Sequence, residues 1–145
     1  MTDLDRNVPI RWFEEVWNGG RRAAIAEMLA PDAILHEGGT DCVGPEGFYP
    51  FYDRLTAAFS DFRVTIQDTL SEGDKVCVRW TCTCQHTGDG MGTPATQRTV
   101  HVTGISIMRI ANGQMVEGWQ SWDMLGMMEQ IQGWRRSATY VAAAG

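Results

Sequence analysis

The stretch VCVRWTCTCQH, Val76 to His86, alternates between two kinds of side chain over its whole length. Because successive side chains of a strand point to opposite faces, the alternation predicts a long β-strand with one face against a core. The other face is expected to meet solvent or a partner subunit. The predicted inner set is Val76, Val78, Trp80, Cys82, Cys84 and His86.

The chain after this strand keeps the same period of two, as does the segment just before it. Strands are expected over 62–70, 98–110 and 115–122, joined by turns at 71–75 and 111–114 and by a glycine-rich loop at 87–97. Short connections of this kind predict antiparallel hairpins. The second half of the chain is therefore expected to be a four-stranded meander.

The first half of the chain shows the helical period instead. A first helix is expected to be capped by Asn7, with Pro9 in its first turn and an end at residues 18–20. A second helix covers 21–30, a short strand covers 33–37, and a third helix opens at Pro45 and is kinked or delayed by Pro50. Helices followed by a meander indicate an α+β fold, with one domain over residues 1–145.

Composition excludes several classes of partner. The net charge is −6, the pI is about 4.9, and lysine and arginine form no run, which disfavours nucleic acid and anionic membranes. The N-terminal residues lack the pattern of a signal peptide, and no stretch has the length of a membrane span. We therefore expect a cytoplasmic protein whose four cysteines are reduced.

The later strands carry small and polar residues where a filled core would carry leucine or valine. Gly104 and Ser106 share one face of their strand, and Gly118 and Gln120 share one face of the last strand. If these are the inner faces, they leave room and hydrogen-bonding groups for a small molecule. On the outer face Ile105 and Ile107, joined by Trp119 and Met115 in the simplest alternation, favour a homodimer.

Four stretches of the chain resemble the SnoaL-like polyketide cyclase family. They are WFEEVWNGG with the following APDAILHE; GPEGFYPFYDRLTAAFSDFRVTIQD; VCVRWTCTCQHTGDGMGTPATQRTV; and ISIMRIANGQMVEGWQSWDMLGMMEQIQ. The resemblance implies the cone-shaped roll of nuclear transport factor two, limonene epoxide hydrolase and ketosteroid isomerase. In that roll a curved antiparallel sheet wraps around the N-terminal helices and encloses a central pocket, usually in a homodimer formed through the sheets.

The resemblance also implies where catalytic residues should lie. The founding cyclases close a ring by an aldol step without metal or cofactor, using an aspartate on the last strand. If Asp123 is the acid that begins the last helix, that aspartate position is occupied by Gln120. The assisting histidine and glutamine positions hold Ser106 and Gly104, and the epoxide hydrolase arginine and aspartate positions hold Trp80 and Cys82. An amide cannot shuttle a proton as a carboxylate does.

Other residues could move the proton. His36, on the first strand near the expected cavity mouth, is either a base or a core or rim histidine. Asp123 either caps the last helix or, after a one-residue slip, faces the pocket. His86 is interpreted as structural and His101 as an outer-face residue. No metal site is predicted, because Cys82 and His86 would be about 13 Å apart along a strand.

These observations lead to a working hypothesis and a rival. The hypothesis is a cofactor-free enzyme of SnoaL-like type acting on a cyclic or polyketide-like apolar molecule, by cyclisation as the default or by hydroxylation or epoxide opening. His36, Asp123 and Gln120 are its expected catalytic residues. The rival is a binding protein on the same fold, in which no ionisable group touches the cavity. The expected ligand-binding residues are Trp12, Tyr49, Tyr52, Trp80, Cys82, Ser106 and Trp122.

Overall fold

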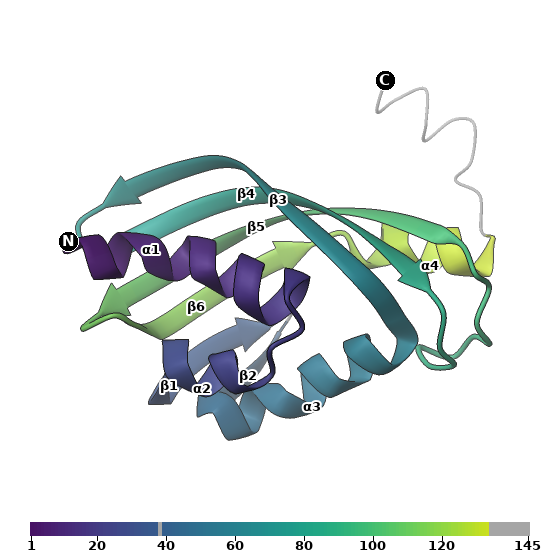
Figure 1. The fold of residues 1–145 in the computed structure, drawn as a ribbon, viewed down its shortest axis with the longest axis horizontal. Helices are drawn as coiled ribbons and strands as arrows, with labels where there is room; N and C mark the ends of the chain where they lie inside the picture. Colours follow the sequence, from purple (N-terminus) through teal and green to yellow (C-terminus); the bar gives the residue numbers. More distant parts are fainter. Residues whose placement is uncertain (38, 134–145) are drawn as a thin grey trace.

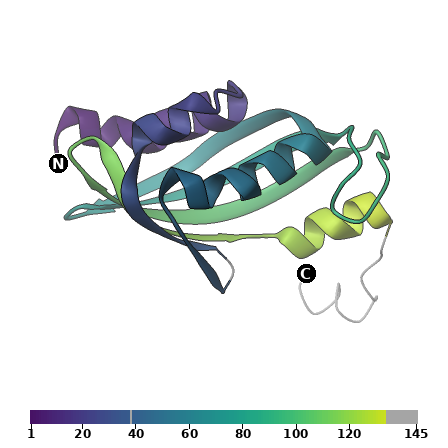
Figure 2. The same cartoon turned by 90° about the horizontal axis from the view of Figure 1, so that it is seen from below.

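The computed structural model describes residues 1–37 and 39–133, and the remainder of the predicted domain lies outside the described residues. Its elements lie in the order helices first, meander second, as expected, with α1, α2 and α3 on one side of a curved sheet (Figures 1 and 2). Among the described residues, no helix is both long and apolar enough to cross a membrane. The predicted α+β class is confirmed.

The first helix begins earlier than predicted. Helix α1 covers Asp3–Arg11 and is capped by Thr2, not by Asn7. The Asp5 N–H donates to Thr2 Oγ1 (3.1 Å), while the Thr2 N–H donates to the Asp5 carboxylate (3.3 Å). This reciprocal capping box outweighs the proline signal, so Pro9 lies inside the helix. A π-helical segment, η1 (Trp12–Asn18), continues it.

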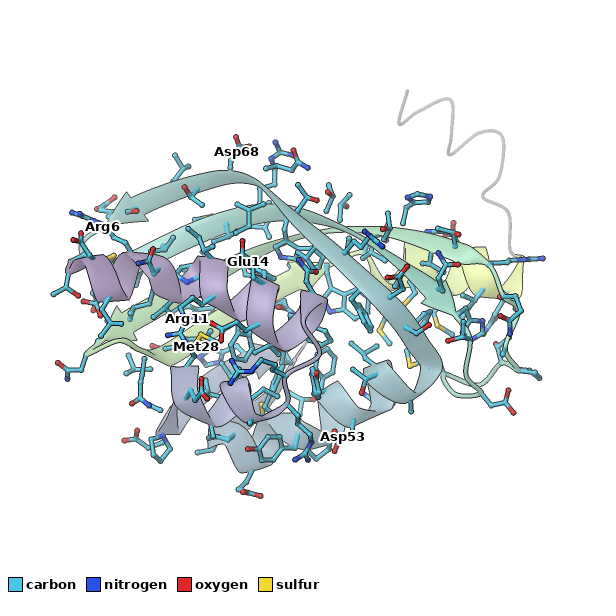
Figure 3. All side chains as sticks on the ribbon, viewed as in Figure 1. Arg6, Arg11, Glu14, Met28, Asp53 and Asp68 are labelled. Atoms are coloured by element: carbon cyan, nitrogen blue, oxygen red, sulfur yellow. The ribbon has the colours of Figure 1, made fainter. Side chains whose placement is uncertain are left out.

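Two further helices complete the layer that covers the sheet. Helix α2 covers Ala23–Met28, and helix α3 covers Gly44–Ala58 with Pro50 inside it. The guanidinium group of Arg22 joins them, with Nε–Oδ1 and Nη2–Oδ2 distances of 2.9 Å to Asp53 (labelled in Figure 3). It also lies 3.9 Å from the centre of the Tyr49 ring. These contacts hold α3 beside α2 over the sheet.

Within the described residues, the sheet has six strands in the order β2-β1-β6-β5-β4-β3. The predicted meander is confirmed as β3 (Phe59–Glu72), β4 (Lys75–His86), β5 (Thr99–Ala111) and β6 (Gln114–Trp122). Strand β1 (Leu29–Glu37) is longer than predicted, and β2 (Thr40–Val43) was not predicted. Strand β1 pairs with β6 in parallel, whereas the other pairings between the described strands are antiparallel.

The inner face of the meander follows the predicted alternation on β4 and β5. On β4, every member of the set from Val76 to His86 is buried. On β6, a register shift lies between the pairs Arg109–Glu117 and Ile110–Met115. The extra residue of this bulge turns Met115 inward, where it is 3% exposed, so its predicted place on the outer face was wrong.

The last helix, α4 (Met124–Gln132), begins where β6 ends (Figure 2). The Asp123 carboxylate accepts the Gly126 N–H at 2.9 Å, which confirms the predicted N-cap. Gln130 then fixes the helix to β5: its Oε1 accepts the His101 N–H (2.9 Å) and its Nε2 donates to the His101 carbonyl (2.8 Å). Helix α4 thereby covers the end of the sheet near Met127, which is buried.

Candidate active site

The larger of two neighbouring cavities lies between the helices and the inner face of the sheet. It encloses about 490 Å³ of space free of atoms, part of it open to solvent. Its wall is almost entirely apolar and aromatic, as is typical of small-molecule sites. The lining residues are Phe13, Trp17, Phe51, Leu55, Phe62, Val64, Trp80, Cys82, Cys84, Val102, Gln120, Trp122 and Met127.

A smaller cavity of about 300 Å³ lies on the other side of Gln120, whose side chain belongs to both walls. Its polar lining comes from Glu37, Ser106 and Gln120, and its apolar lining includes Trp12 and Met115. The two cavities together therefore form an apolar chamber with a polar recess beside it.

The small residues of the inner face contribute less room than the sequence suggested. A Cβ atom on Gly104 would lie 2.3 Å from the Trp80 ring, so the indole itself fills that space. A Cβ atom on Gly118 would lie 2.9 Å from Leu35 and 3.1 Å from Met115. The expected space at Gly104 is therefore filled by the Trp80 ring, whereas Gly118 lies beside Leu35 and Met115 and lines the smaller cavity.

Glu37 is the acidic side chain that the sequence reasoning missed. Alternation along β1 turns Leu35 and Glu37 inward, and the parallel register places Glu37 directly beside Gln120. Gln120 Nε2–H donates to Glu37 Oε2 at 3.3 Å. Burial raises the pKa of Glu37 to about 7, because a carboxylate is poorly solvated in this recess. A group that titrates near neutral pH can both accept and return a proton.

His36, the neighbouring residue, points to the opposite face of the sheet and lines neither cavity. Its Nδ1 lies 2.8 Å from Asp41 Oδ1 and its Nε2 lies 2.9 Å from Glu117 Oε2, and its ring stacks on Trp119. The hydrogen bonds to Glu117 and then Asp41 raise the pKa of His36. Both nitrogens are thus held by carboxylates on the outer face, so His36 is not placed to act as a base in the cavity.

The other predicted site residues divide into three groups. Trp80, Cys82, Trp122 and Gln120 line the larger cavity, and Trp12 and Ser106 line the smaller one together with Gln120. Asp123 lines neither, since its carboxylate caps α4.

Tyr49 and Tyr52 also lie outside both cavities. The Tyr52 hydroxyl donates to the Val16 carbonyl (2.9 Å), and the Tyr49 ring packs on Arg22. Both tyrosines are thus used for packing, Tyr52 against η1 and Tyr49 against Arg22 at the start of α2.

The fold and this pocket define a class of protein: an α+β roll with a pocket between its helices and its sheet. The sequence model of the SnoaL-like polyketide cyclase family matches residues 7–131. The chain therefore belongs to the SnoaL-like polyketide cyclase family. No curated protein matches it.

Solved structures agree with this assignment. IdmH, a candidate polyketide cyclase from Streptomyces antibioticus, is 28% identical, with a TM-score of 0.77 over 88% of this chain and 98% of that one. A candidate polyketide cyclase from Acidithiobacillus ferrooxidans is 25% identical, with a TM-score of 0.80 over 93% of this chain and 99% of that one. AclR, a candidate hydroxylase from Streptomyces galilaeus, has a TM-score of 0.84 over 97% of this chain and 93% of that one, and at 20% identity it shows the fold alone.

Proposed function

We propose that the protein is a cofactor-independent enzyme that carries out acid–base chemistry on a cyclic or polyketide-like apolar molecule, with cyclisation as its reaction. The observation that carries this proposal is Glu37, a carboxyl group with a pKa of about 7 at the polar recess of an aromatic chamber. A binding protein needs the chamber but has no need of such a group.

The lining of the cavities favours a flat, apolar and uncharged substrate. Aromatic side chains such as Phe13, Trp17 and Trp80 suit a flat apolar body in the larger cavity. Among the described residues that line the two cavities, none is lysine, arginine or histidine. A carboxylate or phosphate on the substrate would therefore find no cation, so an uncharged ketone or ester is favoured over a free acid.

The proposed step balances around one proton. Glu37 in its carboxylate form takes a proton from a carbon next to a substrate carbonyl, and the electron pair of that C–H bond forms an enolate. The enolate carbon attacks a second carbonyl carbon of the same molecule, which closes the ring. The alkoxide that results takes the proton back from Glu37. Gln120, at the boundary of the two cavities, would donate an N–H to a substrate oxygen and orient it.

The test uses two readouts with and without Glu37. Binding of a flat hydroxylated anthraquinone is followed by quenching of tryptophan fluorescence. Proton abstraction is followed by NMR as deuterium exchange at the carbon between the carbonyls of an aromatic β-keto ester. Glu37→Gln should keep the binding and lower the protein-dependent exchange by roughly 10²- to 10⁴-fold. The exposed Glu72→Gln is the matched control and should leave both unchanged.

The outcome separates the two classes of function. Exchange that persists in Glu37→Gln would remove this residue from the chemistry. Binding with no protein-dependent exchange in the wild type would favour the binding protein instead.

A further inference from the structure

Four side chains from four neighbouring strands form one hydrogen-bonded row across the inner face of the sheet. Trp80 Nε1–H donates to Ser106 Oγ at 3.0 Å, and this contact is buried. Ser106 Oγ–H donates to Gln120 Oε1 at 3.3 Å, and Gln120 Nε2–H donates to Glu37 Oε2 at 3.3 Å. The residues belong to β4, β5, β6 and β1, which are adjacent in that order.

The chemistry of the first member gives the row a direction. An indole nitrogen can only donate, so Ser106 accepts from Trp80 and its own proton is free for Gln120. The amide oxygen of Gln120 then accepts, and its N–H₂ group is left facing Glu37. The oxygen and nitrogen ends of an amide have the same shape, so the hydroxyl proton on one side and the carboxylate on the other together set its orientation. The row ends on a carboxylate, which only accepts when ionised.

Gly104 makes room for the Trp80 indole, which donates the first hydrogen bond of the row. It pairs with Trp80 across β4 and β5, and the indole lies over it so closely that any Cβ atom would be 2.3 Å from the ring. The absence of a side chain at this position allows the indole nitrogen to reach Ser106, which lies two residues further along β5. The glycine that seemed to make room for a ligand thus makes room for the first donor of the row.

We propose that Trp80 and Ser106 are positioning residues that orient the Gln120 amide, so that its N–H holds Glu37 Oε2 and leaves Oε1 to exchange a proton with the substrate. The catalytic part of this inference rests on the proposed function, whereas the effect of the row on Glu37 does not. Among the described residues, no other hydrogen bond reaches the Glu37 carboxylate. An N–H held against the carboxylate favours its ionised form, so the row opposes the effect of burial.

The test measures the titration of Glu37 directly and needs no substrate. The side-chain carboxyl carbons of glutamate are labelled with ¹³C in the full chain and followed by NMR from pH 4 to 9, and the Glu37 signal is identified by its loss in Glu37→Gln. Ser106→Ala removes the donor to Gln120 Oε1 and lets the amide turn its oxygen toward Glu37. We expect the pKa of Glu37 to rise by roughly one pH unit in this variant.

Companion variants separate orientation from simple damage. Ser106→Thr keeps the hydroxyl and should retain the wild-type pKa of Glu37, and Trp80→Phe should raise it by less than Ser106→Ala does. Ser121→Ala changes a serine on the exposed outer face of β6 and should have no effect. If Ser106→Ala does not fold, the comparison of Trp80→Phe with Ser121→Ala tests the same point.

The results distinguish this inference from the proposed function. A wild-type pKa near 7 that Ser106→Ala and Trp80→Phe leave unchanged would overturn the positioning role alone. An ordinary wild-type pKa that still rises in Ser106→Ala would support the row and remove the basis of the proposed function.

Discussion

Replacing Glu37 by glutamine should change how the stability of the protein depends on pH. Burial raises the pKa of this carboxyl group from 4.5 to about 7 in the folded state. The folded protein therefore binds the proton more tightly than the unfolded chain does. The free energy of unfolding should fall as pH rises from about 4.5 to about 7 and then stay level, as far as Glu37 contributes.

The size of this contribution follows from the same two values. One pH unit corresponds to about 1.4 kcal/mol, so full expression of the shift would cost about 3 kcal/mol above pH 7. Because the side chain is only half-buried, solvent screening reduces the expected cost to about 1–2 kcal/mol. Glu37→Gln has no charge to desolvate, so the variant should gain this amount relative to the wild type between pH 5 and pH 8.

Urea denaturation at pH 5, 6, 7 and 8, followed by tryptophan fluorescence at one fixed protein concentration, measures the effect. Subtracting wild-type from variant values cancels the other titrating groups. Glu72→Gln, at an exposed end of β3, is the matched control for removing one surface carboxylate. If the difference in free energy of unfolding between Glu37→Gln and the wild type stays constant from pH 5 to pH 8, the burial of a titrating carboxyl group at this position is refuted.

Three further outcomes are expected. Asp123→Ala should lower the free energy of unfolding by about 0.5–2 kcal/mol and leave anthraquinone binding intact, whereas Asp123→Asn retains a capping oxygen and should lose less stability. A loss of binding in Asp123→Ala at unchanged stability would contradict the capping role. His36→Gln should lose more stability at pH 6 than at pH 9, because the raised pKa of His36 stabilises the folded protein only below the folded-state value. Thermal melts at both pH values measure the loss, and equal losses would contradict the role of the His36 charge. We also propose a homodimer through the outer sheet face, where Ile105 and Ile107 are 48% and 37% exposed. Sedimentation should give about twice the 16.2 kDa mass of one chain, and Ile105→Lys should lower the measured mass toward that of the monomer. A wild-type protein that sediments as a monomer at micromolar concentration would exclude the dimer.

The parts of the fold that the sequence predicts are those set by local pattern. The alternation of β4 places Trp80 and Cys82 inward because side-chain direction in a strand depends only on parity. The cap by Asp123 is equally local. Met115 escaped prediction because a bulge changes the parity of β6, and a bulge has no reliable signature in one sequence.

The candidate site could be predicted only in part, because its polar row depends on contacts between distant strands. Glu37 and Gln120 meet through a parallel pairing of β1 with β6, which no hairpin signal announces. The alternation of AILHE places Glu37 on the same face as Leu35, so its inward direction could have been predicted. The catalytic role was instead predicted for His36, the residue beside it. The partner of each residue, and hence its pKa, required the sheet order.

The place of the acid is the point at which this chain departs from the pattern that its family resemblance implies. That pattern puts an aspartate at position 120, on the last strand, and an amide at this position would by itself favour a protein that binds without reacting. The carboxylate of Glu37 lies 3.3 Å from that amide and is carried by the neighbouring strand, so the recess still contains an acid although the position has changed. Ser106 and Trp80 hold the Gln120 amide from the opposite side, so its N–H group faces the Glu37 carboxylate. A search for the acid by sequence position alone would therefore classify this chain as inactive, whereas the geometry of four adjacent strands supports an acid–base site.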